Sequence, residues 1–292
     1  MLKELREFGV TQRNRAVFLQ HALWASSTRD HFPVDSSSNF VVSMASYPGR
    51  IHQVPAVYES LARQKIQPRA AYLVLSEEDF PRREVPPGIR KLEDRGVSVV
   101  WSQENPFAVK KLVEVWGKNP GCSIVTFDDD FIYAPDLLPV IREQAQKRDR
   151  SVLGFVGKQL FRKGRELSMM YRERRPADEQ SDPKRVYLQG GLGTWYQPGS
   201  LDERFINRQA FSKIVPGRGS DIWFWAAAVA ADTDQFCLSP YTHSRMYFPI
   251  PQNDRTKPLD RPGRQILEER FQRTIDYFGI REKLIRELPD RA

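Results

Sequence analysis

The stretch CSIVTFDDD (122–130) joins a short apolar run to three consecutive carboxylates. Residues 122–127 have the length and the β-branched content of a buried strand. Three similar apolar runs come earlier in the chain, at 39–46, 70–76 and 97–101, and helix-like segments separate them. Strands that alternate with helices in this way predict an α/β fold, with a mostly parallel central sheet flanked by helices.

Helix-like spacing of apolar residues recurs along the chain. It occurs at 51–65, 107–118, 135–147, 200–211 and 220–233. In 200–211, Ser200 is the expected N-cap and Glu203 stands three residues later, which is the spacing of a capping box. A further strand is predicted at 151–157, and apolar residues alternate with glycines from 185 to 196. The second half of the chain is therefore expected to be a more irregular α+β region.

The composition is that of a folded protein, because 40% of the 292 residues are hydrophobic and 28% are charged. The longest apolar run, 222–231, has about half of the roughly 20 residues that a membrane span needs. The N-terminus lacks the apolar core of a secretory signal, so we expect a cytoplasmic protein. We expect three parts: a helical extension with a linker (1–38), a main domain (39–262) and a C-terminal helical segment (263–292).

The net charge is +8, and half of this excess falls in 158–185, which holds nine Lys or Arg and five Asp or Glu. We expect this basic segment to be a mobile loop. A basic excess indicates an anionic partner: nucleic acid, anionic lipid or a substrate that bears phosphate. The segment would suit peripheral contact with the inner face of a membrane, and a solvated insertion without a partner stays equally open.

The carboxylates at 128–130 come where open parallel sheets bind ligands, outside the carboxyl ends of the strands. Alternate residues of an extended segment point the same way, so Asp128 and Asp130 converge on one ligand while Asp129 turns toward the scaffold. Hard oxygen ligands of this kind suit Mg²⁺ or Mn²⁺. The alternative is a solvated acidic turn that caps the following helix.

Three other motifs accompany Asp128-x-Asp130. They are Ser46-Tyr47-Pro48-Gly49-Arg50-Ile51 after the first strand, Lys110-Lys111-Leu112 in the helix before the acidic strand, and Gly219-Ser220-Asp221-Ile222-Trp223 at the start of a later helix. With the motifs in this order over 39–251, the chain resembles the metal-dependent nucleotide-sugar glycosyltransferases of the GT-A fold, of bacterial type. This resemblance implies a GT-A-like, Rossmann-like sheet. It also implies a hexosyltransferase of polysaccharide biosynthesis, which moves a sugar from a UDP- or GDP-sugar to a glycan or lipid-linked hydroxyl.

The resemblance implies a role for each candidate residue. These roles are Ser46 and Tyr47 at the nucleoside, Arg50 and Lys111 at phosphate, Asp128 at the ribose or the metal, Asp130 and His243 at the metal, Gly190 and Gly191 under the donor sugar, and Asp221 as general base. The lysine register, Lys110 or Lys111, stays open, because Phe107 and Ala108 stand where this subgroup tends to have a Gly-Pro turn. A purely structural role, as core, cap or bend, is the alternative for each residue.

Two other functions are compatible with the motifs. A phosphotransferase or phosphatase can use an aspartate nucleophile in a D-x-D motif, although that class usually carries it on the first strand, and three strands precede Asp128 here. A nucleic-acid-binding protein would use the charge of the basic segment. Three carboxylates repel phosphates unless a metal is present, so nucleic acid is not the partner we expect.

Overall fold

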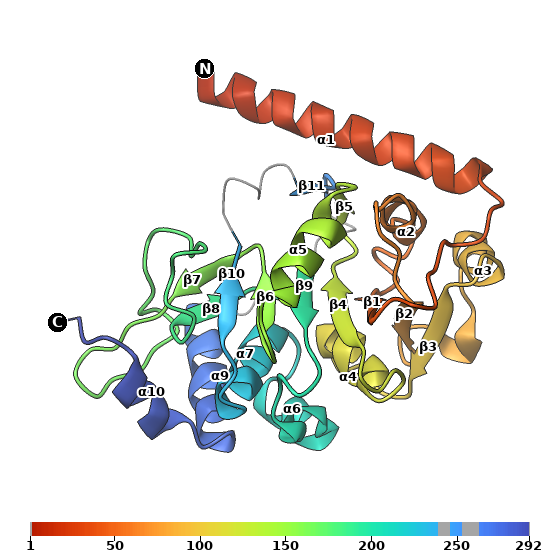
Figure 1. Ribbon diagram of the computed structural model, residues 1–292. Coiled ribbons are helices and arrows are strands. Elements are labelled where there is room, and N and C mark those ends of the chain that lie inside the picture. The colour runs from red at the N-terminus through yellow and green to blue at the C-terminus, as the bar shows by residue number, and fades with distance from the viewer. Residues whose placement is uncertain (1, 239–245, 253–262, 292) are drawn as a thin grey trace.

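The computed structural model describes residues 2–238, 246–252 and 263–291, and a seven-stranded sheet forms its centre (Figure 1). Its strands are β1 (Phe40–Ala45), β2 (Ala71–Ser76), β3 (Ser98–Ser102), β4 (Ser123–Phe127), β6 (Val152–Gly154), β9 (Leu192–Tyr196) and β10 (Gln235–Cys237). In space they follow the order β10-β6-β9-β4-β1-β2-β3. Strands β4, β1, β2 and β3 run parallel, as do β6 and β10, and only β9 is antiparallel to its neighbours in this sheet. The predicted mostly parallel sheet is confirmed.

Helices cover both faces of this sheet (Figure 1). They include α1 (Leu2–Ser27), α2 (Val54–Ala62), α3 (Pro87–Asp94), α4 (Lys110–Trp116), α5 (Leu137–Gln146), α6 (Arg208–Ile214), α7 (Ser220–Ala230), α9 (Arg264–Tyr277) and α10 (Arg281–Glu287). Val41 belongs to the core under α4 and α7, whereas Phe40 and Val42 belong to the core under α2, α3 and α5. Alternate residues of a strand thus enter two cores, which explains why β1 is apolar without interruption.

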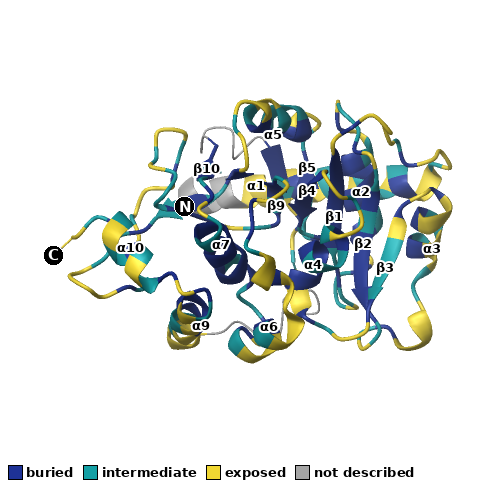
Figure 2. Cartoon of the chain, turned by 60° about the horizontal axis from the view of Figure 1, so that its bottom comes forward, coloured by how far each residue is buried: buried dark blue, intermediate teal, exposed yellow. Residues whose placement is uncertain are grey.

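The deepest elements are the central strands and α7, which Figure 2 draws in dark blue. The sequence of α7, SDIWFWAAAVA, is apolar on all sides after its first turn, and such a helix is stable only inside a core. Phe271 of α9 stacks on Trp225 of α7, and Leu284 of α10 lies in the same core. The division of the chain into three parts stays a prediction.

Two small antiparallel sheets stand beside the central one. They pair β5 (Phe131–Tyr133) with β11 (Tyr247–Pro249), and β7 (Gly157–Gln159) with β8 (Val186–Leu188). The strand predicted at 151–157 is therefore two strands, β6 and β7, that belong to different sheets. The expectation of an irregular second half is confirmed.

The helix predicted at 200–211 is wrong. A 3₁₀ helix at Glu203–Ile206 and the separate helix α6 occupy this region. The side chain of Asp202 accepts a hydrogen bond from the backbone N–H of Arg204, and that of Asn207 accepts one from Ala210. These two caps begin two short helices, and Ser200 is buried outside both of them.

The basic segment 158–185 is packed, so the predicted mobile loop is also wrong. Leu160, Leu167 and Ala177 interrupt its charges and are buried in the core. Two ion pairs hold its ends, Arg162 with Asp290 at 2.7 Å and Arg185 with Glu173 at 2.9 Å. The apolar residues between the charges give this segment its fixed path across α9 and α10.

Helix α1 packs across α2 at the edge of the molecule (Figure 1). The guanidinium of Arg63 lies 3.8 Å from the centre of the Trp24 ring, and the Lys91 ammonium donates to the backbone carbonyls of Ala25 and Ser26. These contacts fix the C-terminal end of α1. Within the described parts of the chain, no helix is long and apolar enough to cross a membrane.

Candidate active site

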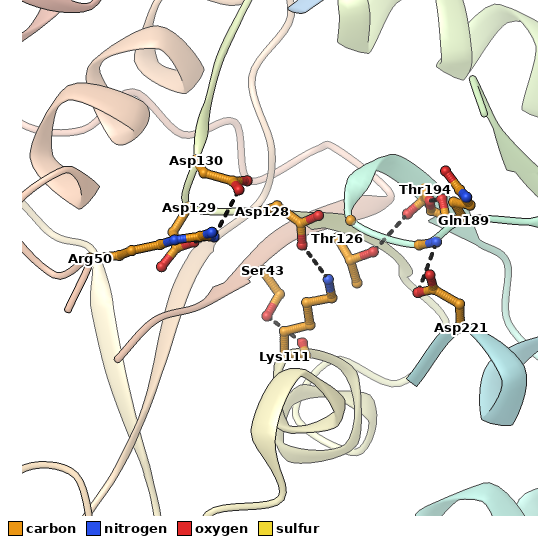
Figure 3. Close-up of polar contacts among 12 residues, drawn as sticks. Ser43, Arg50, Lys111, Thr126, Asp128, Asp129, Asp130, Gln189, Thr194 and Asp221 are labelled. Atoms are coloured by element: carbon orange, nitrogen blue, oxygen red, sulfur yellow. Dashed lines mark hydrogen bonds and ion pairs between the residues drawn. The ribbon is translucent and has the colours of Figure 1, made fainter. Parts of the chain in front are cut away.

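The carboxyl ends of β1 and β4 bring two sequence motifs together. The strands are parallel neighbours in which Met44 pairs with Phe127, so the residues that follow them meet at one edge of the sheet. The Ser46 hydroxyl donates a 2.6 Å hydrogen bond to Asp129, although 83 residues separate the two. In Figure 3, Asp129 and Asp130 lie near Arg50, and Asp128 lies between them and Asp221, which is in the first turn of α7. This edge is where parallel sheets place ligand sites.

Asp129 turns into the protein, as the alternation of an extended segment predicts. Its carboxylate accepts hydrogen bonds from Ser46 and from the Arg50 guanidinium, the latter at 3.1 Å. Burial raises the pKa of Asp129, and Arg50 and Ser46 act against that rise. Asp129 therefore orients the loop from inside, and Ser46 is occupied in holding it.

Arg50 joins two of the three carboxylates. Its guanidinium lies 2.8 Å from Asp130 as well as 3.1 Å from Asp129 (Figure 3). Burial disfavours the charge of Arg50, but Asp130 and Asp129 outweigh burial and raise its pKa. The predicted contact of Arg50 with phosphate stays a prediction, since its described partners are these carboxylates.

Of the two adjacent lysines, Lys111 is the one that points at Asp128. Its ammonium donates a 2.7 Å hydrogen bond to Asp128, and the Ser43 hydroxyl donates to the backbone carbonyl of Lys111. Lys110 points elsewhere, toward Asp79 at 3.6 Å. Burial would lower the pKa of Lys111, but Asp128 outweighs it and the pKa is raised. The Lys111 side chain is 3% exposed, so its paired ammonium is buried at the edge of the site.

Tyr133 is a site residue that the sequence analysis missed. Its hydroxyl accepts a hydrogen bond from the backbone N–H of Asp128 at 2.9 Å and lies 3.1 Å from the carbonyl oxygen of Gly191. Tyr133 thus ties the acidic loop after β4 to the glycine turn before β9. The signal in the sequence was a tyrosine in an apolar triplet that directly follows the carboxylates.

The glycine turn contacts both ends of the site. The backbone N–H of Gly190 donates a 3.1 Å hydrogen bond to Asp221, in the first turn of α7. Gly191 has φ +99°, and a Cβ there would lie 2.1 Å from a carboxylate oxygen of Asp128. Only glycine leaves room for that carboxylate, so Gly190 and Gly191 place Asp128 and Asp221 on either side of one turn.

Gly191→Ala is expected to lower the unfolding free energy by more than its backbone strain alone would. Gly96 is the matched control, because it has φ +98° and no atom within 4 Å of its Cβ position. Both variants lose about 1–2 kcal/mol of unfolding free energy from the left-handed backbone. The clash with Asp128 should cost Gly191→Ala about 1–3 kcal/mol more in denaturant unfolding. Equal losses in the two variants would contradict the contact.

Asp221 and Asp130 have raised pKa values. Burial, with the nearby charge of Asp128, raises the pKa of Asp221 to about 6, while Lys111 and the Gly190 N–H act in the opposite direction. Burial and Asp128 raise the pKa of Asp130 to about 7 in spite of Arg50. Burial is the main cause of both pKa rises, and the negative charge of Asp128 adds to each of them.

The site suits a divalent cation. Its carboxylates are those of Asp128, Asp129, Asp130 and Asp221, and its cations are Arg50 and Lys111. Among the described residues, no group of three or more His, Cys, Asp or Glu side chains is placed to hold a metal ion. Two carboxylates, Asp128 and Asp130, are nevertheless enough for Mg²⁺ or Mn²⁺ when substrate phosphates and water supply the other ligands. The hard donors and the unbalanced charge fit such an ion.

Tyr47 and His243 are the two remaining residues of the predicted site. The ring of Tyr47 lies at the edge of the site, with the Arg50 guanidinium 5.7 Å from its centre, and burial raises its pKa. His243 lies outside the described residues. Its place among the metal ligands therefore stays a prediction.

A pocket of about 350 Å³ opens beside Asp221. Besides Asp221, its walls include Met169, Arg172, Tyr187, Arg218 and Leu267. Neither arginine was among the predicted site residues, because they lie in segments far apart along the chain. Only the packing of 158–185 against α7 and α9 brings them together.

No family model matches this chain, and no curated protein matches it in sequence. Among solved structures, a mannosyltransferase from Pyrobaculum calidifontis in complex with GDP-Man and Mn²⁺ is 12% identical, with 79% of this chain and 64% of that chain covered and a TM-score of 0.41. S. aureus TarS, residues 1–349, is 13% identical, with 73% and 60% covered and a TM-score of 0.42. This chain spans less than two thirds of either structure. At such low identity and overlap we draw no conclusion from them about its chemistry.

Proposed function

We propose that this chain is a metal-dependent glycosyltransferase, which moves a sugar from a nucleotide-diphosphate sugar to a hydroxyl acceptor. The observation that carries the proposal is the arrangement around one glycine turn at the carboxyl edge of the sheet. Asp128, paired with Lys111, lies on one side of this turn, and Asp221 accepts a hydrogen bond from it on the other. Asp128, the proposed metal ligand, and Asp221, the proposed general base, thus flank the place where a sugar would bind.

In the donor half of the reaction, the negative charge on the departing diphosphate must be stabilised. Asp128 and Asp130 would hold Mn²⁺ or Mg²⁺, which supplies electrostatic stabilisation of the leaving group when bound. Lys111 adds a fixed positive charge next to Asp128 at no cost in reorganisation, because it is already buried and paired there. We assign to Tyr47 the role of stacking on the nucleobase of the donor. Gly190 and Gly191 would form the floor of the pocket that holds the donor sugar.

The acceptor half needs a base. In an inverting transfer, the acceptor oxygen forms the new bond to the anomeric carbon while the bond from that carbon to the diphosphate oxygen breaks. The acceptor proton passes to a carboxylate, and the nucleoside diphosphate leaves with the electron pair of the broken bond. Asp221 suits this task, because a pKa of about 6 keeps it ionised at neutral pH yet basic enough to accept a proton.

The competing functions have less support from these contacts. An aspartate nucleophile for phosphoryl transfer usually follows the first strand of its sheet, whereas Asp128 follows β4, the fourth strand along the chain. The basic segment, which would serve a nucleic acid, contributes its buried residues to the core. A donor of the UDP- or GDP-sugar class, a role in polysaccharide biosynthesis and contact with a membrane surface remain parts of the proposal.

Nucleotide binding should require the metal. We expect UDP or GDP to bind at least about tenfold more weakly after EDTA treatment, and Asp130→Asn to weaken binding in Mn²⁺ to a similar degree. Titration calorimetry measures both. Asp136→Asn is the control, because Asp136 is an exposed acid paired with Lys65, away from the site. Affinity that is the same with and without EDTA would contradict the metal-dependent proposal.

A further inference from the structure

The pocket beside Asp221 differs from the carboxylate-rich edge of the site in its charge. Of the described residues that line it, Asp221 is the single acid and Arg172 and Arg218 are the bases. The pocket therefore has a positive balance directly next to the proposed general base. Tyr187 also lines the pocket, where burial raises its pKa, Asp221 adds to that rise and Arg172 opposes it.

Arg218 is held in place by its backbone. It lies between Gly217 and Gly219, which have φ +86° and +133°, and a Cβ on Gly219 would lie 2.6 Å from Val215. The guanidinium of Arg270, on α9, donates to the carbonyl oxygen of Arg218. This tight turn leads directly into α7, so Arg218 stands three residues before Asp221 on the same wall of the pocket.

Arg172 comes from the basic segment on the opposite wall. The backbone of Arg172 forms a β-bridge with that of Leu160. The side chain of Leu160 is buried, so this part of the backbone is anchored in the core. The acids nearest along the chain are engaged elsewhere: Glu173 with Arg185 at 2.9 Å, and Glu166 with the Tyr171 hydroxyl at 3.0 Å. Arg172 thus brings a positive charge to the pocket, and neither of these acids lines it.

Apolar side chains complete the walls. Met169, Ile222 and Leu267 come from the basic segment, α7 and α9. A surface of this kind packs against the carbon-bound face of a sugar ring, while arginines bind an acidic substituent through charge-assisted hydrogen bonds. A pocket of about 350 Å³ has room for one or two sugar rings.

We propose that this pocket is the acceptor site and that it selects an acidic saccharide, one that carries a carboxylate or a phosphate group. Arg172 and Arg218 bind the acidic group, and this places a neighbouring hydroxyl of the same sugar at Asp221. The assignment of the pocket as the acceptor site rests on the proposed function. Its preference for acidic saccharides can be measured without a sugar donor. It also gives the charge of the basic segment a use: one of its arginines recognises the acceptor.

The test measures binding of three small probes to the full chain in the absence of nucleotide. Methyl glucuronide carries a carboxylate, glucose 6-phosphate carries a phosphate, and methyl glucoside is neutral. Saturation-transfer NMR titrations give the three dissociation constants. We expect at least one acidic probe to bind about tenfold more tightly than the neutral one, and the stronger of the two identifies the acidic group.

Two variants locate the effect. Arg172→Gln should bring acidic and neutral probes to within about twofold of each other, whereas Arg175→Gln removes the same charge from an exposed residue of the same segment outside the pocket and should keep the preference. Equal binding of all three probes, no binding of any probe, or equal effects of the two variants would overturn the inference. Selective acid binding without any UDP or GDP binding would keep the pocket and reject the glycosyltransferase.

Discussion

Asp221→Asn is expected to lower kcat by about 10²- to 10⁴-fold while the affinity for nucleotide stays within a few-fold. Asparagine keeps the size of the side chain and can still accept the hydrogen bond from the Gly190 N–H, but it cannot take the proton of the acceptor hydroxyl. Steady-state transfer assays give kcat, and calorimetry with UDP or GDP gives the affinity. A near-normal kcat would mean that another group is the base.

The pH dependence of kcat is a second test of the role of Asp221. Because the pKa of Asp221 is raised to about 6, it holds a proton below that pH and acts as a base above it. We therefore expect kcat to rise with pH through about 6 and then to level off, and this rise should be absent from the residual activity of Asp221→Asn. Burial does most to raise this pKa, Lys111 lowers it, and Asp128 raises it further.

The stability of Asp221→Asn should distinguish a catalytic role of Asp221 from a role as a helix cap. A raised pKa means that the folded protein binds this proton more tightly than the unfolded chain does. The stability from Asp221 is thus fully present below its ordinary value of 3.8 and is lost as the pH rises through about 6. At pH 8 the neutral asparagine should give a melting temperature at least as high as that of the parent. A large fall would indicate that the residue serves as a helix cap.

Lys111→Met is expected to produce the other large effect. It leaves Asp128 without its partner and removes the fixed charge that would face a departing diphosphate, so we expect kcat to fall by about 10²- to 10³-fold. The unfolding free energy should fall by about 2–3 kcal/mol. This is less than the loss of about 3–5 kcal/mol typical of fully buried pairs, because 34% of the Asp128 side chain is exposed.

Lys110→Met is the matched control for this variant. Lys110 is the preceding residue on the same helix and is equally buried, at 3% side-chain exposure, but it pairs with Asp79. Its loss should destabilise the fold to a similar extent, as measured by denaturant unfolding, while kcat changes only a few-fold. If both variants lost kcat equally, the role of Lys111 would be general stability.

The regular half of the fold was predictable because its signals are local. Four apolar runs at 39–46, 70–76, 97–101 and 122–127 became β1 to β4 within two residues at either end. Periodicity is a property of neighbouring residues, and strands covered on both faces have no polar side to confuse the pattern. The helix predicted at 200–211 failed for a related reason: Asp202 and Asn207 cap two short turns, and their competition with the Ser200 signal is decided by packing.

The site divides in the same way. The sequence by itself determined that carboxylates end a buried strand of a parallel sheet, and hence that Asp128 and Asp130 stand at the edge where such sheets generally place ligand sites. Only the tertiary structure decided that Lys111, and not Lys110, meets Asp128, and that Gly191 leaves room for that carboxylate. These contacts join segments 17 to more than 60 residues apart, and no local pattern encodes them. They exist because two closely packed cores fix the distances between strands and helices whose own sequences specify only which face is apolar.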